Sequence, residues 1–174
     1  LRGPVLAFWV FHVIRDYART LVASKSRMAA ECPYYLALAD ELEEAQAPLP
    51  IIFGHNDLLP ANLLDDGARL WLIDFEYAGF NTAMFDIAGL ASNAGMQADE
   101  SEDLFGYYFG KAPDRAMKHA YSAMQCASLL REAMWGMVSE KHMPSTDIDY
   151  VEYSEQNLKK LRAALEIHQK HKGK

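Results

Sequence analysis

Two spacings of apolar residues alternate along the chain. Apolar side chains that recur every three or four positions predict helices, and short β-branched or alternating runs predict strands. The first spacing predicts helices over residues 5–30, 34–46, 84–95, 100–110, 114–142 and 148–170. The second predicts short strands at residues 51–54, 62–64 and 70–74, all in the first half of the chain. The expected fold class is therefore α+β and mostly helical.

Turn and breaker residues bound these elements. Pro33 suits the first turn of a helix, and the segment APLP at residues 47–50 ends that helix. The segment DDGA at residues 65–68 predicts a hairpin turn with Gly67 at the positive φ position. The first helix is apolar on nearly every face, so we expect other parts of the protein to cover most of it. Its apolar residues are Val5, Leu6, Phe8, Trp9, Val10, Phe11, Val13 and Ile14.

A polar loop interrupts the predicted strands. The stretch FGHNDLLPANLL, residues 53–64, places His55, Asn56, Asp57 and Asn62 between two apolar segments. A loop that flanking strands hold in place is a common way to fix functional side chains rigidly. The hairpin follows directly, and its second predicted strand ends in Asp74.

Composition narrows the function classes. A chain of 174 residues is long enough for one domain with its own core. The net charge of −7 disfavours a nucleic-acid partner and favours a cationic one, although many proteins are acidic without such a partner. Cys32 and Cys126 have no metal-site spacing and read as reduced thiols of a cytoplasmic protein. The longest apolar run, PVLAFWVF, is too short to span a membrane and lacks the features of a signal peptide.

Asp57, Asn62 and Asp74 form the set of groups that phosphoryl transfer requires. A carboxylate must hold the acceptor hydroxyl and take its proton, and an amide oxygen with a second carboxylate must hold magnesium on the triphosphate. The segments HNDLLPAN and IDFE match the catalytic loop H-x-D-x-x-x-x-N and the metal-binding Asp-Phe of kinases, in the same order. We expect His55 to brace the loop. The alternative is an Asx-rich turn beside an incidental acidic residue.

The sequence departs from protein kinases at several points. Leu59 occupies the position of their catalytic-loop lysine, and Glu76 replaces the glycine of Asp-Phe-Gly. No Ala-Pro-Glu segment follows. The chain therefore does not look like a protein kinase.

The chain resembles the choline/ethanolamine kinases, within the wider aminoglycoside-phosphotransferase-like group of small-molecule kinases. The resemblance covers nearly the whole chain and implies a protein-kinase-like C-terminal lobe whose small hairpin carries the catalytic and metal-binding loops. The segments that carry it are HNDLLPANLL (55–64), LIDFEYAG (72–79), FDIAGLASNAG (85–95), REAMWGMVSEK (131–141) and DYVEYSEQNLKKL (149–161).

The resemblance implies a role for each matching residue. Asp57 is the expected catalytic base, and Asn62 and Asp74 are the expected Mg²⁺ ligands. Glu76 belongs to the same acidic site and is an expected substrate-binding residue. Asp86, with His55 and Asn56, is expected to support the catalytic loop.

The resemblance also implies an aromatic pocket for the substrate. Trp135 matches a tryptophan that contacts choline, and a tryptophan face attracts a quaternary ammonium group. Tyr77, Tyr150 and Tyr153 could complete the pocket. The alternatives are a core tryptophan and ordinary half-buried tyrosines. Two family positions differ: a second aromatic residue is Val138 here, and an acidic residue is Asn93.

Kinases of this fold need an N-terminal lobe that covers the nucleotide. No glycine-rich loop or strand lysine precedes residue 53, so we expect that lobe to be absent from this chain and the isolated chain to be nearly inactive. The expected function is ATP-dependent phosphorylation of choline or a related small amino-alcohol. Ethanolamine, thiamine or an aminoglycoside remain alternative acceptors, and a non-catalytic substrate-binding lobe is the other reading. The C-terminal HQKHKGK is expected to be a solvated basic tail, not a metal site.

Overall fold

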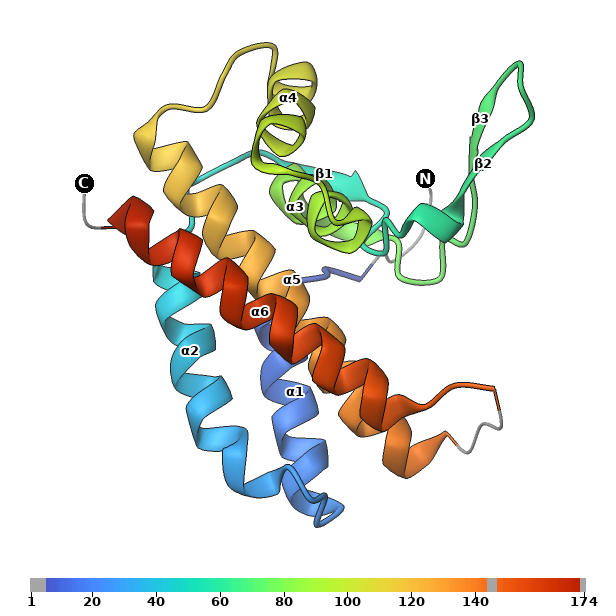
Figure 1. Cartoon of the computed structure of the whole chain (residues 1–174), viewed down its shortest axis with the longest axis vertical. Helices are drawn as coiled ribbons and strands as arrows, with labels where there is room; N and C mark the ends of the chain where they lie inside the picture. Colours follow the sequence, from blue (N-terminus) through green and yellow to red (C-terminus); the bar gives the residue numbers. More distant parts are fainter. Residues whose placement is uncertain (1–5, 144–146, 173–174) are drawn as a thin grey trace.

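The computed structural model describes residues 6–143 and 147–172. Helices dominate it, and a long helix runs through its middle (Figure 1). The α-helices are α1 (Val10–Ala23), α2 (Cys32–Glu44), α3 (Ala83–Ala94), α4 (Ala98–Phe109), α5 (Arg115–His142) and α6 (Tyr150–Lys172), with short 3₁₀ turns at Ala29–Glu31 and Pro60–Asn62.

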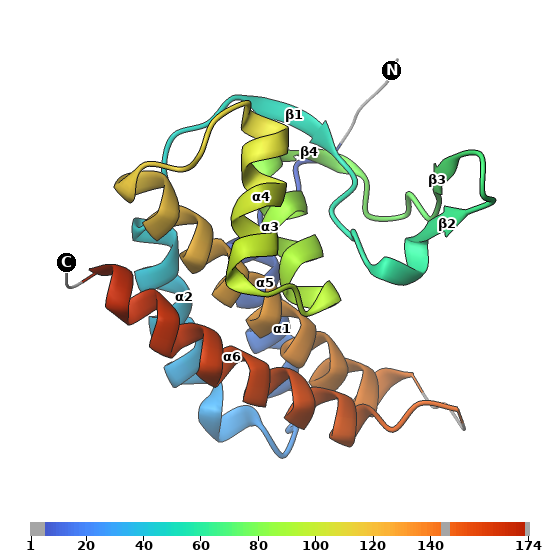
Figure 2. The ribbon, with the colours of Figure 1, turned by 45° about the horizontal axis from the view of Figure 1, so that its top comes forward.

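Two small antiparallel sheets accompany the helices. β1 (Ile51–Gly54) pairs with β4 (Gly79–Thr82), and β2 (Leu63–Asp65) pairs with β3 (Leu70–Leu72). Figure 2 shows β1 and β4 side by side near α3, while the β2–β3 hairpin projects away from the helices. The polar loop connects β1 to β2, so it lies where the helical body meets the projecting hairpin.

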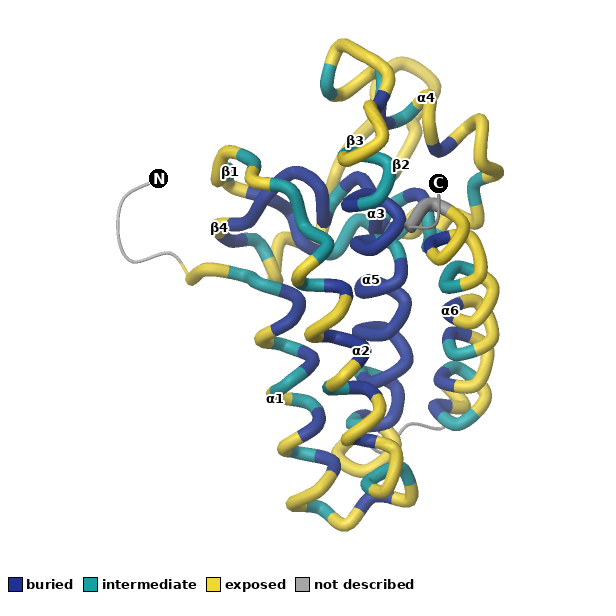
Figure 3. The backbone as a smooth tube through the Cα atoms, turned by 90° about the vertical axis from the view of Figure 1, so that its left-hand side faces the viewer, coloured by how far each residue is buried: buried dark blue, intermediate teal, exposed yellow. Residues whose placement is uncertain are grey.

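The core is built around α5. This helix packs against α6, α3, α1 and α2, and Figure 3 shows it buried along most of its length. Asp114 caps its start, since the Asp114 Oδ1 accepts a hydrogen bond of 2.9 Å from the Met117 N–H. Gly136 allows α6 to approach closely, because a Cβ there would lie 2.5 Å from Ser154 Oγ. A larger side chain at position 136 would therefore require α6 to shift.

The first helix differs from the prediction. α1 begins at Val10, and residues 6–9 are extended instead of helical. The Phe8 N–H donates to the Phe80 oxygen at 2.8 Å, and the Phe80 N–H donates to the Leu6 oxygen at 2.9 Å, so this segment borders β4. The helix ends at Ala23, and a turn leads to the 3₁₀ segment before α2. Its coverage was also mispredicted, because α1 is amphipathic and exposes His12, Asp16 and Arg19.

Other boundaries also differ. β4 was not predicted, because GFNT contains a single β-branched residue and its partner β1 lies 25 or more positions earlier in the chain. β3 ends at Leu72, so Asp74 lies beyond the strand. α6 begins at Tyr150 instead of residue 148. Of the predicted loop at 144–147, residues 144–146 lie outside the described part of the chain.

Two findings bear on the composition arguments. Cys32 and Cys126 are buried free thiols, and burial raises the pKa of Cys126 to about 12. Among the residues that the structure describes, no helix has the length and apolar character needed to cross a membrane.

Candidate functional site

The polar loop is anchored to the first turn of α3. The backbone N–H groups of His55 and Asn56 donate to the two carboxylate oxygens of Asp86, at 2.8 and 2.6 Å. Burial raises the pKa of Asp86, and the two N–H donors act against that rise. Gly54 leaves room for this contact, since a Cβ there would lie 2.9 Å from Asp86 Oδ2. One half-buried carboxylate thus fixes the backbone just before Asp57.

Asn56 and His55 tie the loop to the segment after β3. Asn56 is fully buried with a φ angle of 63°, a conformation that asparagine adopts more readily than most residues. Its Nδ2 donates to the Tyr77 oxygen at 3.0 Å, and its Oδ1 accepts from Asn81 Nδ2 at 3.0 Å. The buried His55 ring places Nε2 2.8 Å from the Ile73 oxygen. Asp86, His55 and Asn56, which were expected to support the loop, each form hydrogen bonds that connect the loop to another segment.

Asp57, Asn62 and Asp74 lie on connected pieces of backbone. Asn62 Nδ2 donates to the Asp57 carbonyl oxygen at 3.0 Å, and the Ile73 N–H donates to the Asn62 carbonyl oxygen at 3.0 Å. Asn62 is therefore held between the other two. Asp74 follows Ile73 directly, is exposed, and has a φ angle of 63°. The three residues of the sequence motif thus lie on neighbouring backbone segments in the structure.

Asn62 and Asp74 are chemically suited to hold magnesium. Since the Asn62 amide nitrogen donates to Asp57, its Oδ1 is left to accept or coordinate. The Asp74 carboxylate is exposed and makes no hydrogen bond or ion pair within the described residues. Magnesium prefers such hard oxygen ligands and usually takes the remainder from water and substrate phosphates. Among the side chains that the structure describes, in residues 6–143 and 147–170, no three His, Cys, Asp or Glu residues gather as a metal site of their own.

A small cavity of about 90 Å³ opens beside Asp57. It is lined by Asp57, Leu59, Tyr77, Arg131, Glu132, Trp135 and Tyr153. Trp135 is half-buried, and its ring centre lies 5.7 Å from that of Tyr150 and 5.5 Å from that of Tyr153. The structure therefore brings Tyr77, Trp135 and Tyr153, three of the residues expected in the aromatic pocket, to one cavity with Asp57. Glu76 is exposed and does not line the cavity, and neither do Asn62 and Asp74.

Sequence reasoning missed the two charged residues that line this cavity together with Asp57. Arg131 and Glu132 are only 3% and 4% exposed, and one Arg131 nitrogen, Nη1, donates both to Asp57 Oδ1 at 3.2 Å and to Glu132 Oε1. The Tyr153 hydroxyl donates to the other Glu132 oxygen at 2.6 Å. Burial raises the pKa of Asp57, and Arg131 opposes that rise. The available signal was a charged pair within the apolar stretch SLLREAMW.

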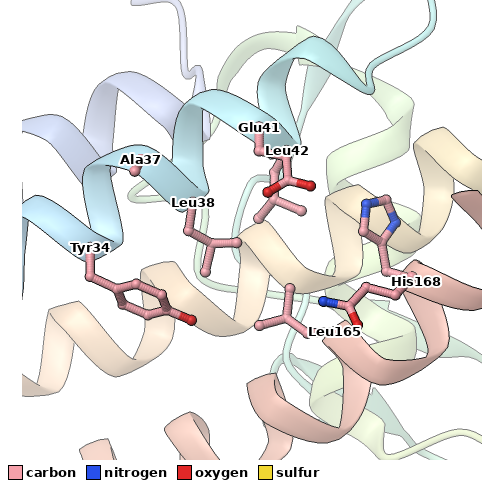
Figure 4. Close-up of a pocket in the computed structure, with 8 residues that line it drawn as sticks. Tyr34, Ala37, Leu38, Glu41, Leu42, Leu165 and His168 are labelled. Carbon is pink, nitrogen blue, oxygen red and sulfur yellow. The ribbon is translucent and has the colours of Figure 1, made fainter.

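A second cavity lies between α2 and α6 and includes no residue of the polar loop. It measures about 260 Å³, and Figure 4 shows Tyr34, Leu38, Glu41, Leu165 and His168 around it. His168 corrects the prediction of a solvated tail, because it is 2% exposed and its Nδ1 lies 2.8 Å from Ser122 Oγ. His168 lies four residues before the end of α6 at Lys172, and it faces the core against α5. The side chain of the second tail histidine, at position 171, lies outside the described part.

Comparison with known proteins relates the chain to a family. The sequence profile of the family described as choline/ethanolamine kinase matches residues 9–108, more than half of the chain, including the polar loop and the hairpin. The chain belongs to the choline/ethanolamine kinase family.

Individual family members match over most of the chain. Protein LicA of Haemophilus influenzae is 28% identical over 169 residues, which cover 92% of this chain and 48% of that protein. Human ethanolamine kinase 2 is 26% identical over 181 residues, covering 88% of this chain and 45% of that protein. The chain thus spans about half the length of these curated relatives.

The fold agrees as well. The crystal structure of a choline/ethanolamine kinase family protein from Mesorhizobium loti superposes with a TM-score of 0.84 at 26% identity. The match covers 98% of this chain and 60% of that one. The expected fold class, a mostly helical α+β lobe of the kinase-like C-terminal type, is confirmed.

Proposed function

We propose that this chain is the acceptor-binding and metal-binding lobe of a kinase that uses ATP to phosphorylate the hydroxyl of choline or a related small amino-alcohol. The observation that carries the proposal is the position of Asp57. Its backbone oxygen contacts Asn62, and its carboxylate lines a cavity with Tyr77, Trp135 and Tyr153. One residue thus joins the metal-binding side of the loop to the aromatic pocket.

The chemistry follows from that position. The Asp57 carboxylate accepts a hydrogen bond from the acceptor hydroxyl and takes its proton as the alcohol oxygen bonds to the γ-phosphorus. The bond from that phosphorus to the bridging oxygen of ADP breaks in the same transfer. Asn62 and Asp74 are the residues suited to hold Mg²⁺, which neutralises charge on the triphosphate when bound. Asp86, His55 and Asn56 keep Asp57 in place, and positioning is a large part of catalysis in phosphoryl transfer.

The aromatic wall supports a cationic head group on the acceptor. An ammonium group over the ring of Trp135, with the rings of Tyr77 and Tyr153 on the same cavity, gains attraction from the π-electron faces. Choline and ethanolamine both satisfy this chemistry. The names of the curated relatives include ethanolamine kinase and choline/ethanolamine kinase. Neither Val138 nor Asn93 offers the aromatic and acidic groups expected from the family resemblance, so both acceptors belong to the proposal.

Binding of the nucleotide requires groups beyond Asn62 and Asp74. Kinases of this fold cover the phosphates with a second lobe, and we propose that such a lobe completes this site in the full-length protein. The 174-residue chain by itself is expected to transfer phosphate slowly, because part of the positioning apparatus is not in it. Turnover by the isolated chain at a rate typical of kinases would contradict this part of the proposal.

The direct test uses the full-length protein with ATP and magnesium and a panel of choline, ethanolamine, thiamine and an aminoglycoside. We expect phosphorylation of choline, ethanolamine or both, and loss of product formation in the Asp57→Asn variant. Glu140→Gln on α5 is a matched control, because Glu140 pairs with Arg27 outside the cavity. Absence of transfer to every member of the panel, or undiminished transfer by Asp57→Asn, would overturn the proposed function.

A further inference from the structure

The buried charges in the cavity beside Asp57 do not balance, because it has more acidic than basic side chains. Of its seven lining residues, Asp57 and Glu132 are acidic and Arg131 is basic, so the formal charge is −2 + 1 = −1. The side chains of Asp57, Arg131 and Glu132 are 13%, 4% and 5% exposed. A charge held away from water is unfavourable unless a partner of opposite sign compensates it. One negative charge in this cavity is left without a lining partner.

The contacts explain why the arrangement holds together without that partner. Arg131 divides one guanidinium nitrogen between Asp57 and Glu132, and its guanidinium carbon lies 5.0 Å from the centre of the Tyr77 ring. Tyr153 donates to the second oxygen of Glu132. Arg131 therefore reduces the charge of the carboxylate pair from −2 to −1, and the tyrosine hydroxyl stabilises what remains. The surplus charge faces a cavity walled by aromatic rings.

An acceptor with a single positive charge would neutralise this cavity. A neutral alcohol of the same shape would leave the surplus charge buried and would cover it further from water. The carboxylate that makes the difference comes from α5 at Glu132, whereas the family resemblance placed an acidic residue at the position of Asn93 in α3.

We infer that Glu132, held by Arg131 and Tyr153, is the specificity-determining residue that makes this cavity select a monocationic alcohol over a neutral alcohol of the same shape. The inference rests on the proposed function, since it assumes that the cavity beside Asp57 receives the acceptor. Glu132 acts through its charge, while Arg131 limits the surplus to one and positions Asp57.

The experiment compares choline with 3,3-dimethyl-1-butanol, its neutral carbon isostere, as acceptors for the full-length protein. The measured quantity is the ratio of kcat/KM for choline to kcat/KM for the isostere. Glu132→Gln keeps the size and hydrogen-bonding capacity of the side chain and removes its charge. We expect this variant to lower the ratio by roughly tenfold or more, mainly through the KM for choline, because charges at contact distance interact strongly away from bulk water.

Three comparisons keep the outcome interpretable. Glu132→Asp retains the charge and should retain most of the ratio, and Glu140→Gln removes a charge from the same helix outside the cavity and should leave the ratio unchanged. A ratio near one in the unmodified protein would overturn the inference without any variant, so the test survives if Glu132→Gln does not fold. An unchanged ratio in Glu132→Gln, or equal losses in the Gln and Asp variants, would overturn it as well.

Failure of the proposed function would look different. In that case the full-length protein would phosphorylate none of the alcohols. Calorimetric binding of choline against the isostere then still tests the charge of the cavity: preferential binding of choline that Glu132→Gln abolishes supports the inference, and equal binding of both compounds overturns it.

Discussion

The two carboxylates of the phosphotransfer motif, Asp57 and Asp74, occupy contrasting surroundings. Asp57 lies on the anchored loop and faces α5, with 13% of its side chain exposed and an ion pair to Arg131. Asp74 lies on the connection after the projecting hairpin, where Ile73 and Phe75 on either side of it are exposed too. The site therefore has a buried side around Asp57, which contacts within the protein hold in place, and an open side around Asp74, which is exposed to solvent.

This difference is consistent with the work proposed for each residue. A general base must be held within hydrogen-bonding reach of one acceptor hydroxyl, so buried contacts that fix its position are useful. A metal ligand completes its geometry only when the ion, water and triphosphate arrive, so an exposed carboxylate suits it. Mutations on the buried side are therefore expected to change the position of the general base, and mutations on the open side are expected to weaken metal binding.

The largest expected effect is on turnover. Asp57→Asn and Asp74→Asn in the full-length enzyme should each lower kcat by roughly 10²–10⁴-fold, the range associated with loss of a positioned acid–base group, and the loss of a metal ligand should be comparable. Steady-state kinetics with saturating ATP measure this. If either variant retains more than a tenth of the activity, the role assigned to the substituted residue is wrong.

Much of this contrast is invisible in the sequence. The motif from His55 to Asn62 and the hairpin up to Asp74 are local features, because short spacing and turn residues determine them. The ion pair between Arg131 and Asp57 joins residues 74 positions apart, and only the packing of α5 against the loop creates it. Helical spacing shows that Arg131 interrupts an apolar segment, but it does not show what lies opposite.

Trp135 illustrates the same limit. From sequence it had two readings, a pocket residue and a core residue. In the structure it is half-buried, lines the cavity and packs against Tyr150 and Tyr153 of α6. The predicted start of α1 is wrong for a related reason. The apolar residues before Val10 follow a helical spacing, yet the backbone there pairs with β4, a strand more than 70 positions later.

The next largest effect concerns stability on the buried side. Asp86→Ala leaves the His55 and Asn56 N–H groups without their acceptors, and a buried unsatisfied donor costs about 1–3 kcal/mol of unfolding free energy. Glu76→Ala on the open side should change stability by less than about 0.5 kcal/mol, as exposed substitutions usually do. Urea denaturation measures both. Equal losses would show that the loop is not organised more strongly than the hairpin connection.

A smaller effect is expected for the aromatic wall. Trp135→Leu keeps apolar bulk but removes the ring face, and a cation–π contact contributes about 0.5–2 kcal/mol. The KM for choline should rise several-fold in the full-length enzyme, with less effect on ethanolamine and none on the KM for ATP. If the melting temperature falls and the KM for choline does not change selectively, Trp135 serves the core alone.

The smallest effect is a change in pH dependence. Burial raises the pKa of Asp86 above its ordinary value of 3.8, so the folded state binds its proton more tightly than the unfolded state does. The stability that this group contributes is complete below pH 3.8 and is lost as pH rises through the folded pKa. Asp86→Asn should remove this contribution to the decline in unfolding free energy above pH 3.8, as measured by urea denaturation at a series of pH values.

Asp66 in the exposed hairpin is the control for this titration. Its pKa is lowered, chiefly by the hydrogen bond from the Trp71 ring nitrogen, so its stabilising contribution is present above pH 3.8 and is lost as pH falls. Asp66→Asn should therefore leave the slope above pH 3.8 as it is in the unmodified protein. Identical curves for Asp86→Asn and the unmodified protein would contradict the account of the buried carboxylate.

The division of labour between the two carboxylates is tested most directly by magnesium-dependent nucleotide binding. Isothermal titration of ATP into the full-length protein, at a series of magnesium concentrations, is compared for Asp57→Asn and Asp74→Asn. We expect Asp57→Asn to bind the magnesium–nucleotide complex as the unmodified protein does, and Asp74→Asn to need a much higher magnesium concentration for the same occupancy. An identical magnesium dependence in the two variants would contradict the assignment of Asp57 to the acceptor and Asp74 to the metal.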